Sequence, residues 1–339
     1  MCRAVKIDST LTKDIGDLRD DTRRIDRAGF DGVWVGESKH DPFLQVLKVV
    51  EGSERLTVGT AVAIAFARTP MTLAHLGHDL ARYCEGRFVL GLGSQVKPHI
   101  ERRFSMPWSS PAARMRELVL AMRAIWASWD EGTQLDFRGD FYTHTLMTPY
   151  FTPEAHPWGP PPVFLAGVGA RMTEVAGEVC DGFFFHPFTT LDYLREVTVP
   201  ALARGRARSD DPAKGFDVCG PAFAVVGRDE DELARSVAAA KQQLAFYAST
   251  PAYRAVLEHH GWGDLQPELN ELTRQGRWSE MSAGIDDEVL RAFAVIGTPG
   301  EVGRGLREKF EGIATRVTVY SLHDPGAEVW PELVDAFRS

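Results

Sequence analysis

The chain has 339 residues, of which 44% are hydrophobic and 25% are charged, and its 38 basic and 47 acidic side chains give a net charge of −9. This composition excludes a disordered chain, a collagen and a coiled coil, and it supplies enough apolar residues for a sizeable core. The acidic balance argues against nucleic acid or an anionic membrane as a general partner, although a local basic group can still hold a small anion.

Short apolar runs alternate with longer helical patterns, which is typical of a parallel sheet covered by helices on both faces. Strands are predicted at residues 5–7, 32–36, 56–64, 88–92, 163–166, 183–185, 218–226 and 316–320. Helices are predicted at 12–28, from 42 onwards, and at 70–83, 111–129, 170–179, 191–207, 230–247 and 328–337. Eight such units close an α/β (β/α)8 TIM barrel, which is the fold we expect, with a doubly wound open sheet as the alternative.

A barrel of this kind needs about 250 residues, so part of the chain is surplus. We expect one domain over residues 1–339 with insertions at about 134–162, after the fourth helix, and at about 251–312, before the eighth strand. The first insertion is rich in aromatic residues and proline, and the second has a helical pattern.

Cysteine use and apolar runs bear on location. Cys2, Cys84, Cys180 and Cys219 are widely spaced, which indicates reduced thiols rather than a disulfide or zinc framework. The longest apolar stretch, residues 58–67, is too short to span a bilayer, and the first residues have no apolar run of signal-peptide length. We expect a cytoplasmic protein that acts on a small molecule.

Barrel enzymes carry their chemistry where the strands end. After the second predicted strand, Asp41 and Pro42 are a typical N-cap and first helical residue, which explains them without any function. His40 precedes this cap, and at the barrel mouth its ring could bond a cofactor or move a proton near neutral pH. His75 and His78 lie three residues apart on a predicted helix but lack a third ligand, so no metal site is predicted.

Two glycine-containing turns come after later strands. Residues 91–98 (GLGSQVKP) do not match the dinucleotide pattern G-x-G-x-x-G, and we interpret them as a tight turn that lets backbone approach a ligand. Residues 166–172 (AGVGARM) open a helix, whose free N–H groups suit an anion such as a phosphate. A turn that needs glycine only for close packing explains the second segment equally well.

Short segments recur in a characteristic order over most of the chain: AGFDGVWVGE (28–37), HDPF (40–43), VGTAV (58–62), RTP (68–70), GRFVLGLG (86–93), RMRE (114–117), FRGDFY (137–142), AGVG (166–169), AGE (176–178), CDG (180–182) and IGTP (296–299). Together they resemble the luciferase-like monooxygenase superfamily, and within it the branch that uses the deazaflavin coenzyme F420. The resemblance implies a barrel with the isoalloxazine ring in its mouth and a non-prolyl cis peptide in strand three, at Ala61–Val62.

The resemblance also implies site residues. His40 corresponds to a histidine that lies close to the ring and acts as a base. The remaining cofactor contacts would be Ala61, Val62 and Ile64 in strand three, Ser94, Gln95 and His99 after strand four, and Gly167, Val168, Gly169 and Ala170 at the phosphate. Val96 stands where sugar-phosphate dehydrogenases of this branch have a proton-donating glutamate, which disfavours a sugar-phosphate substrate. Lys39, Arg68, Lys97 and Arg171 are candidates to meet the anionic tail of the cofactor.

Three functions remain open at this point. The first is an F420-dependent oxidoreductase that transfers a hydride between the deazaflavin and a small organic substrate. The second is an FMN-dependent monooxygenase that uses reduced flavin and oxygen, and the third is a barrel that only binds a flavin or deazaflavin. The insertion aromatics Phe141, Tyr142, Tyr150, Phe151 and Trp158 either roof the pocket or bury the insertion and a dimer interface, and a homodimer is expected.

Overall fold

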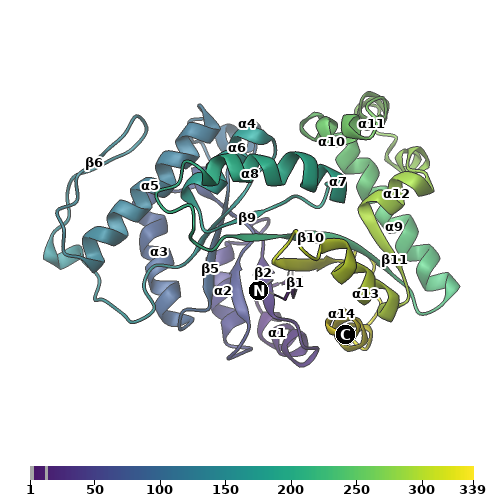
Figure 1. Ribbon diagram of the computed structural model, residues 1–339, viewed down its shortest axis with the longest axis horizontal. Helices are drawn as coiled ribbons and strands as arrows, with labels where there is room; N and C mark the ends of the chain where they lie inside the picture. Colours follow the sequence, from purple (N-terminus) through teal and green to yellow (C-terminus); the bar gives the residue numbers. More distant parts are fainter. Residues whose placement is uncertain (1–3, 12–13) are drawn as a thin grey trace.

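The computed structural model describes residues 4–11 and 14–339, and within them eight parallel strands close a barrel. β10 pairs with β9 on one side and with β12 on the other, and β12 pairs with β1, which completes the ring and confirms the predicted TIM barrel. Figure 1 shows the strands in the middle of the molecule with helices around them. The barrel strands are β1 (Lys6–Leu11), β2 (Gly32–Val35), β3 (Thr57–Thr60), β5 (Phe88–Gly93), β8 (Val163–Ala166), β9 (Gly182–Phe184), β10 (Asp217–Val226) and β12 (Arg316–Tyr320).

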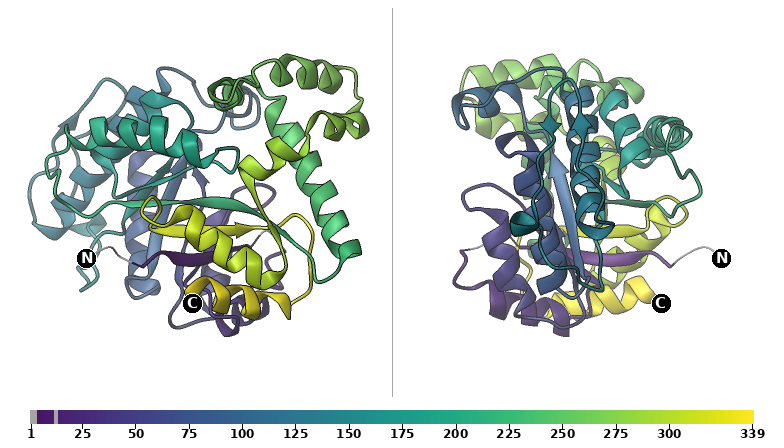
Figure 2. Two further views of the ribbon diagram at one scale, coloured as in Figure 1. Left: turned by 45° about the vertical axis from the view of Figure 1, so that its right-hand side comes forward. Right: turned by 90° about the vertical axis from the view of Figure 1, so that its left-hand side faces the viewer.

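Helices surround the barrel on its outer face (Figure 2). They include α1 (Leu18–Arg27), α2 (Pro42–Val50), α3 (Pro70–Tyr83), α5 (Pro111–Asp130), α6 (Ala170–Val179), α8 (Val199–Arg206), α13 (Pro299–Phe310) and α14 (Val329–Arg338). The predicted cap of α2 is confirmed, because the Asp41 carboxylate accepts a hydrogen bond from the Phe43 N–H at 2.9 Å. In the part of the chain that the structure describes, no helix is both long and apolar enough to cross a bilayer.

Three predicted elements differ from the structure. The first helix begins at Leu18 rather than at residue 12, because a turn held by the Asp14 side chain precedes it, while residues 12–13 lie outside the described chain. The predicted strand 56–64 is divided into β3 and β4 (Ala63–Ile64) by a cis peptide between residues 61 and 62. The predicted helix 191–207 consists of α7 (Leu191–Tyr193), a π-helical turn η3 (Leu194–Thr198) and α8, since Pro200 has no N–H to continue the helical ladder.

The first insertion lies along the outside of α3 and α5. It contains the short hairpin of β6 (Phe137–Arg138) and β7 (Thr143–His144) and the turn η2 (Pro149–Phe151). The Glu117 carboxylate on α5 accepts N–H groups of the hairpin at 2.6–2.9 Å. Trp158 packs against Gly86, which precedes β5, so this tryptophan lies at the end of the barrel opposite the mouth and does not roof a pocket there.

The range predicted as the second insertion holds more than helices. After α9 (Glu230–Ala248) come η4 (Pro251–Tyr253), α10 (Arg254–His259), α11 (Leu265–Arg274), η5 (Trp278–Gly284) and α12 (Asp287–Phe293), which share a second hydrophobic core. The strand β11 (Ala294–Gly297), which a helical interpretation of the range missed, pairs with the last residues of β10. Phe223 pairs with β12 on one edge of β10 and with β11 on the other. On that second edge β9 pairs with the first residues of β10, and β11 takes its place beside the last ones. Helix α13 at the end of the range packs along α14.

The barrel interior combines aromatic packing with a buried ion pair. The Trp34 ring contacts Phe184 edge-on, with centroids 5.1 Å apart, and the same interior cluster includes Phe164. Asp8 on β1 is fully buried, and its carboxylate accepts hydrogen bonds from Arg316 on β12 at 2.6 and 2.7 Å. The Trp34 indole N–H also donates to Asp8, at 3.1 Å. A buried ion pair therefore links the first and last strands of the barrel.

Candidate functional site

Four neighbouring strands bring most of the predicted site segments to one arc of the mouth. Val35 at the end of β2 pairs with Thr60 at the end of β3, and β4 continues this line beside β5. Gly93 at the end of β5 then pairs with Ala166 at the end of β8. The segments that come after these strands carry the predicted His40, Ser94 and Gln95, and the turn at 167–170, around the predicted pair at 61–62.

The peptide between Ala61 and Val62 is cis, as the resemblance implied. The Ala61 N–H donates to the Val35 carbonyl at 2.8 Å, and the Val62 carbonyl accepts the Glu37 N–H at 3.2 Å, so this peptide is bonded to the end of β2 and to the segment that follows it. Both side chains are half-buried and pack on the interior aromatic cluster. Ile64 is buried, with its N–H and carbonyl bonded to Glu37 and Arg68, so its side chain forms part of the core.

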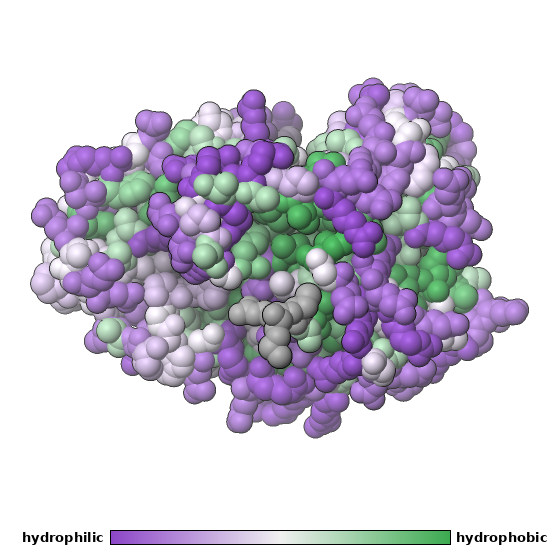
Figure 3. Space-filling model, in the orientation of Figure 1, coloured by the Kyte–Doolittle hydropathy of each residue, from purple (hydrophilic) through white to green (hydrophobic). Residues whose placement is uncertain are grey.

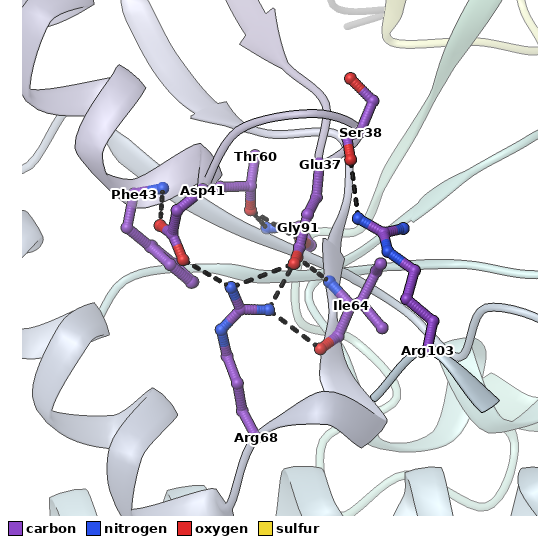
Figure 4. A network of polar contacts seen from close by, with 9 residues as sticks. All are labelled: Glu37, Ser38, Asp41, Phe43, Thr60, Ile64, Arg68, Gly91 and Arg103. Atoms are coloured by element: carbon purple, nitrogen blue, oxygen red, sulfur yellow. Dashed lines mark hydrogen bonds and ion pairs between the residues drawn. The ribbon is translucent and has the colours of Figure 1, made fainter. Parts of the chain in front are cut away.

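The segment that carries His40 is held by an ion pair that the sequence analysis did not identify. Arg68 donates to Glu37 at 2.7 and 3.2 Å and to Asp41 at 2.8 Å, and the same Glu37 carboxylate accepts the Ile64 N–H at 2.7 Å (Figure 4). The Glu37 and Arg68 side chains are only 7% and 13% exposed. Arg68 was a candidate to meet the cofactor tail, and that assignment is wrong, because its guanidinium is committed to these two carboxylates.

His40 itself is exposed, between two fixed points. On one side Arg103 donates to the Ser38 carbonyl at 2.8 Å, and on the other Asp41 caps α2 and bonds Arg68 (Figure 4). Among the described residues, none forms a recorded hydrogen bond or ion pair with the His40 ring. The imidazole is therefore free to bond a ligand while the backbone beneath it is anchored.

The turn after β5 presents polar groups at the same arc. Gln95 has a left-handed backbone, with φ of 60°, and its side-chain oxygen accepts the Val96 N–H at 3.0 Å. Ser94 is half-buried and donates to the Gln95 carbonyl at 3.1 Å. Val96 precedes helix α4 (Lys97–Arg102), an element that the sequence analysis missed, and His99 is exposed on that helix.

The turn between β8 and α6 fits an anionic group. Gly169 has φ of +83°, a left-handed conformation that favours glycine, and a Cβ there would meet nothing within 4 Å. Val168, Gly169 and Ala170 are exposed, and the first N–H groups of α6 have no acceptor within the helix. Open space, free N–H groups and the positive end of the helix dipole together suit a phosphate. Arg171 is also exposed on the first turn.

The floor beside this turn fits a flat ring. Ala61, Val62 and Ala166 are half-buried and lie against the buried aromatic cluster of Trp34, Phe164 and Phe184. A Cβ on Gly93 would lie 2.6 Å from Val62, so the glycine is needed for the close approach of β5 to this floor. Small apolar side chains over an aromatic layer provide a surface on which a planar ring can lie, with the anion site of α6 at its edge.

The opposite wall of the mouth holds a half-buried histidine–tyrosine cluster that the sequence analysis missed. The Nδ1 of His186 accepts the Phe188 N–H at 3.0 Å, while its Nε2 lies 3.0 Å from the Tyr253 hydroxyl. The hydroxyls of Tyr247 and Tyr320 lie 3.1 Å apart beside it. His186 lies just after β9, so its position could have revealed it in the same way as His40. Tyr253 comes from a helical turn 67 residues later and gives no such signal.

These hydrogen bonds determine which atoms of His186 and Tyr253 carry the protons. Because Nδ1 accepts an N–H, the neutral ring carries its proton on Nε2 and donates it to Tyr253. The Tyr253 O–H is then left to donate elsewhere, and burial raises the pKa of this hydroxyl to about 12, which keeps it protonated. His186 and Tyr253 line one cavity together with the turn at 167–170, so a ligand held at that turn lies beside this donor.

Acidification is expected to destabilise the fold through His186. Burial lowers the pKa of His186 from 6.5 to about 4, so the unfolded chain binds the proton first. Its contribution is fully present above pH 6.5 and is lost as the pH falls towards 4, by about 3 kcal/mol in total. Urea unfolding at pH 7.5 and 4.5 should show this loss in the wild type and a clearly smaller loss in His186→Asn, whose amide oxygen keeps the acceptor for Phe188. Equal pH dependence in both proteins would contradict the assignment.

The pair His75 and His78 on α3 packs against α5 and the first insertion. The His75 ring lies 4.7 Å from Trp129, and the His78 ring lies 4.3 Å from His156. His78 Nε2 bonds the Glu154 carbonyl at 3.2 Å, and burial lowers the pKa of His78. Over residues 4–11 and 14–339 no group of three or more potential metal ligands comes together. His78 therefore ties the insertion to α3, while His75 packs on α5.

Comparisons with known proteins agree with this architecture. A family model described as luciferase-like monooxygenase matches residues 3–316. An uncharacterized protein of Mycobacterium tuberculosis is 51% identical over 315 residues, which cover 93% of each chain. The 5,10-methylenetetrahydromethanopterin reductase of Archaeoglobus fulgidus is 25% identical over 322 residues, covering 90% of this chain and 92% of the reductase.

Solved structures share the fold at low sequence identity. The coenzyme F420 dependent tetrahydromethanopterin reductase from Methanopyrus kandleri superimposes with a TM-score of 0.79 and 19% identity, covering 98% of this chain and 97% of that one. The EDTA monooxygenase from Chelativorans sp. superimposes with a TM-score of 0.70 and 15% identity, covering 99% and 94%.

Proposed function

We propose that this chain, which belongs to the luciferase-like monooxygenase family, is an oxidoreductase that uses coenzyme F420 to transfer a hydride to or from a small organic substrate. The relationship to reductases carries the proposal: a methylenetetrahydromethanopterin reductase is 25% identical over nine-tenths of the chain, and the F420-dependent reductase structure has a TM-score of 0.79. The mouth supports it with a flat apolar floor and an adjacent anion site.

Each part of the mouth has a role in this proposal. The floor at Ala61 and Val62 would hold the ring, and the turn from Gly167 to Ala170 would hold the phosphate. When bound, the deazaflavin supplies the carbon that accepts or donates the hydride. His40, free and exposed above an anchored backbone, would move the proton that accompanies the hydride, and the Glu37–Arg68 pair keeps that backbone in place.

The turn that leads from β5 into α4 has a valine where a proton donor would stand. Val96, which is 52% exposed, stands at the start of α4, and Ser94 and Gln95 beside it are neutral. His40 is the proton carrier that we propose, and a valine in place of an acid at position 96 favours a substrate other than a sugar phosphate.

An FMN-dependent monooxygenase is the second candidate, and the similarity in fold to the EDTA monooxygenase favours it. Titration of the purified protein with F420 and, separately, with FMN, followed by fluorescence, tests the choice. We expect saturable F420 binding with a Kd of about 1–10 μM or tighter and FMN binding at least about tenfold weaker. The reverse order would reject the F420 proposal and direct the search to an oxygen-using reaction. Tight F420 binding without turnover on any substrate would support a barrel that only binds its cofactor.

We further propose a homodimer in a reducing cytoplasm. Leu146, Tyr150 and Phe151 in the first insertion are 78%, 89% and 65% exposed, and an interface would remove this apolar surface from water. Cys84, Cys180 and Cys219 are buried free thiols, which suits a reducing compartment, while Cys2 lies outside the described residues. Light scattering after size exclusion should give the mass of two chains, and the mass of one chain would reject the dimer.

A further inference from the structure

A second cavity lies away from the barrel mouth, between α7, the end of α12, β11 and α13. Its volume is about 430 Å³. It is lined by Thr190, Leu191, Asp192, His260, Arg291, Ala292, Ala294, Val295, Ile296 and Lys309. Figure 3 shows hydrophobic surface beside β11, bordered by hydrophilic side chains. The predicted cofactor residues do not line this cavity.

Lys309 on α13 is a cation with one hydrogen-bond acceptor and no ion-pair partner among the described residues. Its Nζ donates to the Ala292 carbonyl at 3.0 Å, which satisfies one of its three N–H groups. Among the described residues no carboxylate forms an ion pair with it within 4 Å. Burial lowers the pKa of the amine to about 8, and the negative charge of Asp192, at longer range, offsets only part of this shift. Buried charges in proteins are normally paired, because an ammonium that leaves water without a counter-ion is costly. The lysine is still mostly protonated at neutral pH, so an anion in the cavity would supply the missing partner.

Arg291 adds a second unpaired cation to the same cavity. It lies one helical turn from Asp287, whose carboxylate bonds Lys241 at 2.7 Å and interacts with Arg291 only at longer range. Within the described chain, Arg291 has no recorded hydrogen bond or ion pair. Its exposed guanidinium is therefore available to a ligand, and its planar donors suit the oxygens of a carboxylate or phosphate.

The other polar groups of the cavity leave room for an anion. His260 bonds the Thr190 hydroxyl at 2.7 Å and stacks on Trp262, and burial together with the neighbouring His259 lowers the pKa of His260, which keeps its ring neutral. Asp192 is the one carboxylate among the lining residues, and it is exposed. Two cations therefore face one anion in the cavity of a protein whose net charge is −9.

We propose that this cavity is a binding site for a small anion, whose phosphate or carboxylate oxygens accept hydrogen bonds from Lys309 and Arg291. The apolar side chains of β11 would contact the uncharged part of the ligand. The anion is either a free small molecule or the charged end of a larger ligand held at the barrel mouth. The inference does not depend on the proposed function, because none of its residues belongs to the site described above.

Calorimetric titration with inorganic phosphate tests the site. The titration is run at pH 8 and constant ionic strength, in two buffers of different ionisation enthalpy. We expect saturable binding with a Kd below about 10 mM and uptake of protons, because a bound anion restores the charged form of Lys309. Lys309→Met, which keeps the apolar stem, should bind at least about tenfold more weakly and lose the proton uptake. Asp192→Asn should bind more tightly, because a like charge is removed.

Lys48→Met is the matched control, since Lys48 pairs with Glu51 on α2, far from the cavity. It should bind phosphate as the wild type does, and thermal melting should show all variants folded. Absence of saturable binding in the wild type, or equal binding in Lys309→Met, would overturn the proposal. A second titration with F420 present follows only the phosphate binding that Lys309→Met removes, because phosphate can also bind at the turn from Gly167 to Ala170. Loss of this binding means that the anion belongs to the tail of F420, and its retention means a free anion.

Discussion

Replacing His40 with alanine is expected to lower the turnover number by about 100- to 10,000-fold, the range that a positioned general acid or base contributes. His40 is exposed, and none of the described residues bonds its ring, so the substitution removes the proton carrier without removing a contact of the fold. Affinity for F420 should change by no more than severalfold, because the ring floor at 61–62 and the turn at 167–170 remain. Turnover is followed by the absorbance of oxidised deazaflavin, with the first substrate that the wild type accepts.

Two further measurements separate a chemical role of His40 from a structural one. Added imidazole should restore part of the turnover of His40→Ala, because the exposed site admits a free base. His259→Ala is the control. The His259 ring lies on α10 and pairs with Glu196, so this variant should retain wild-type turnover. Unchanged turnover in His40→Ala would reject His40 as the base, and so would a variant that lost F420 binding together with activity.

Asp8→Asn is expected to destabilise the fold by about 3–5 kcal/mol. The substitution leaves Arg316, whose side chain is only 7% exposed, with its charge in the barrel interior and no carboxylate to compensate it. Removal of one partner of a buried pair costs far more than the pair contributes, because the remaining charge has lost its water as well. Urea unfolding followed by circular dichroism measures the change in the free energy of unfolding.

The double variant Asp8→Asn/Arg316→Met supplies the decisive comparison, because it removes the stranded charge and should recover much of the lost stability. Glu258→Gln is the matched control for an acid-to-amide change, since Glu258 and its partner Arg254 are both about half exposed. That variant should change stability by less than about 1 kcal/mol. If Asp8→Asn were as mild as Glu258→Gln, the interior ion pair would not contribute as described.

The fold was largely predictable because a closed barrel requires apolar strands at regular intervals. All eight barrel strands were predicted, and the cap at Asp41 placed the start of α2. The errors occur where a single residue changes the backbone. Pro200 interrupts the predicted helix 191–207, and the cis peptide at Ala61 divides the third strand. The short strand β11 was missed because three apolar residues and a glycine after a helix also continue a helical pattern.

The candidate site was only half visible in the sequence. Residues directly after a strand, such as His40 and Gly169, can be found from position alone, since every parallel strand ends at the same face. The groups that hold or complement them cannot be found in this way. Glu37 meets Arg68 across 31 residues, and His186 meets Tyr253 across 67, because the barrel brings together loops that are remote in the chain.

The pairing of β1 with β12 has a consequence for biosynthesis. These strands are separated by about 300 residues, which a ribosome needs about 15–60 s to add. During that time β1 is paired only with β2, on one side, and Asp8 has no ion-pair partner because Arg316 has not yet been synthesised. The open edges of β1 and β10 can then pair with other chains instead. The nascent protein is therefore most prone to aggregate shortly before its last strand emerges, and slower growth or chaperone supply should raise the yield of folded protein.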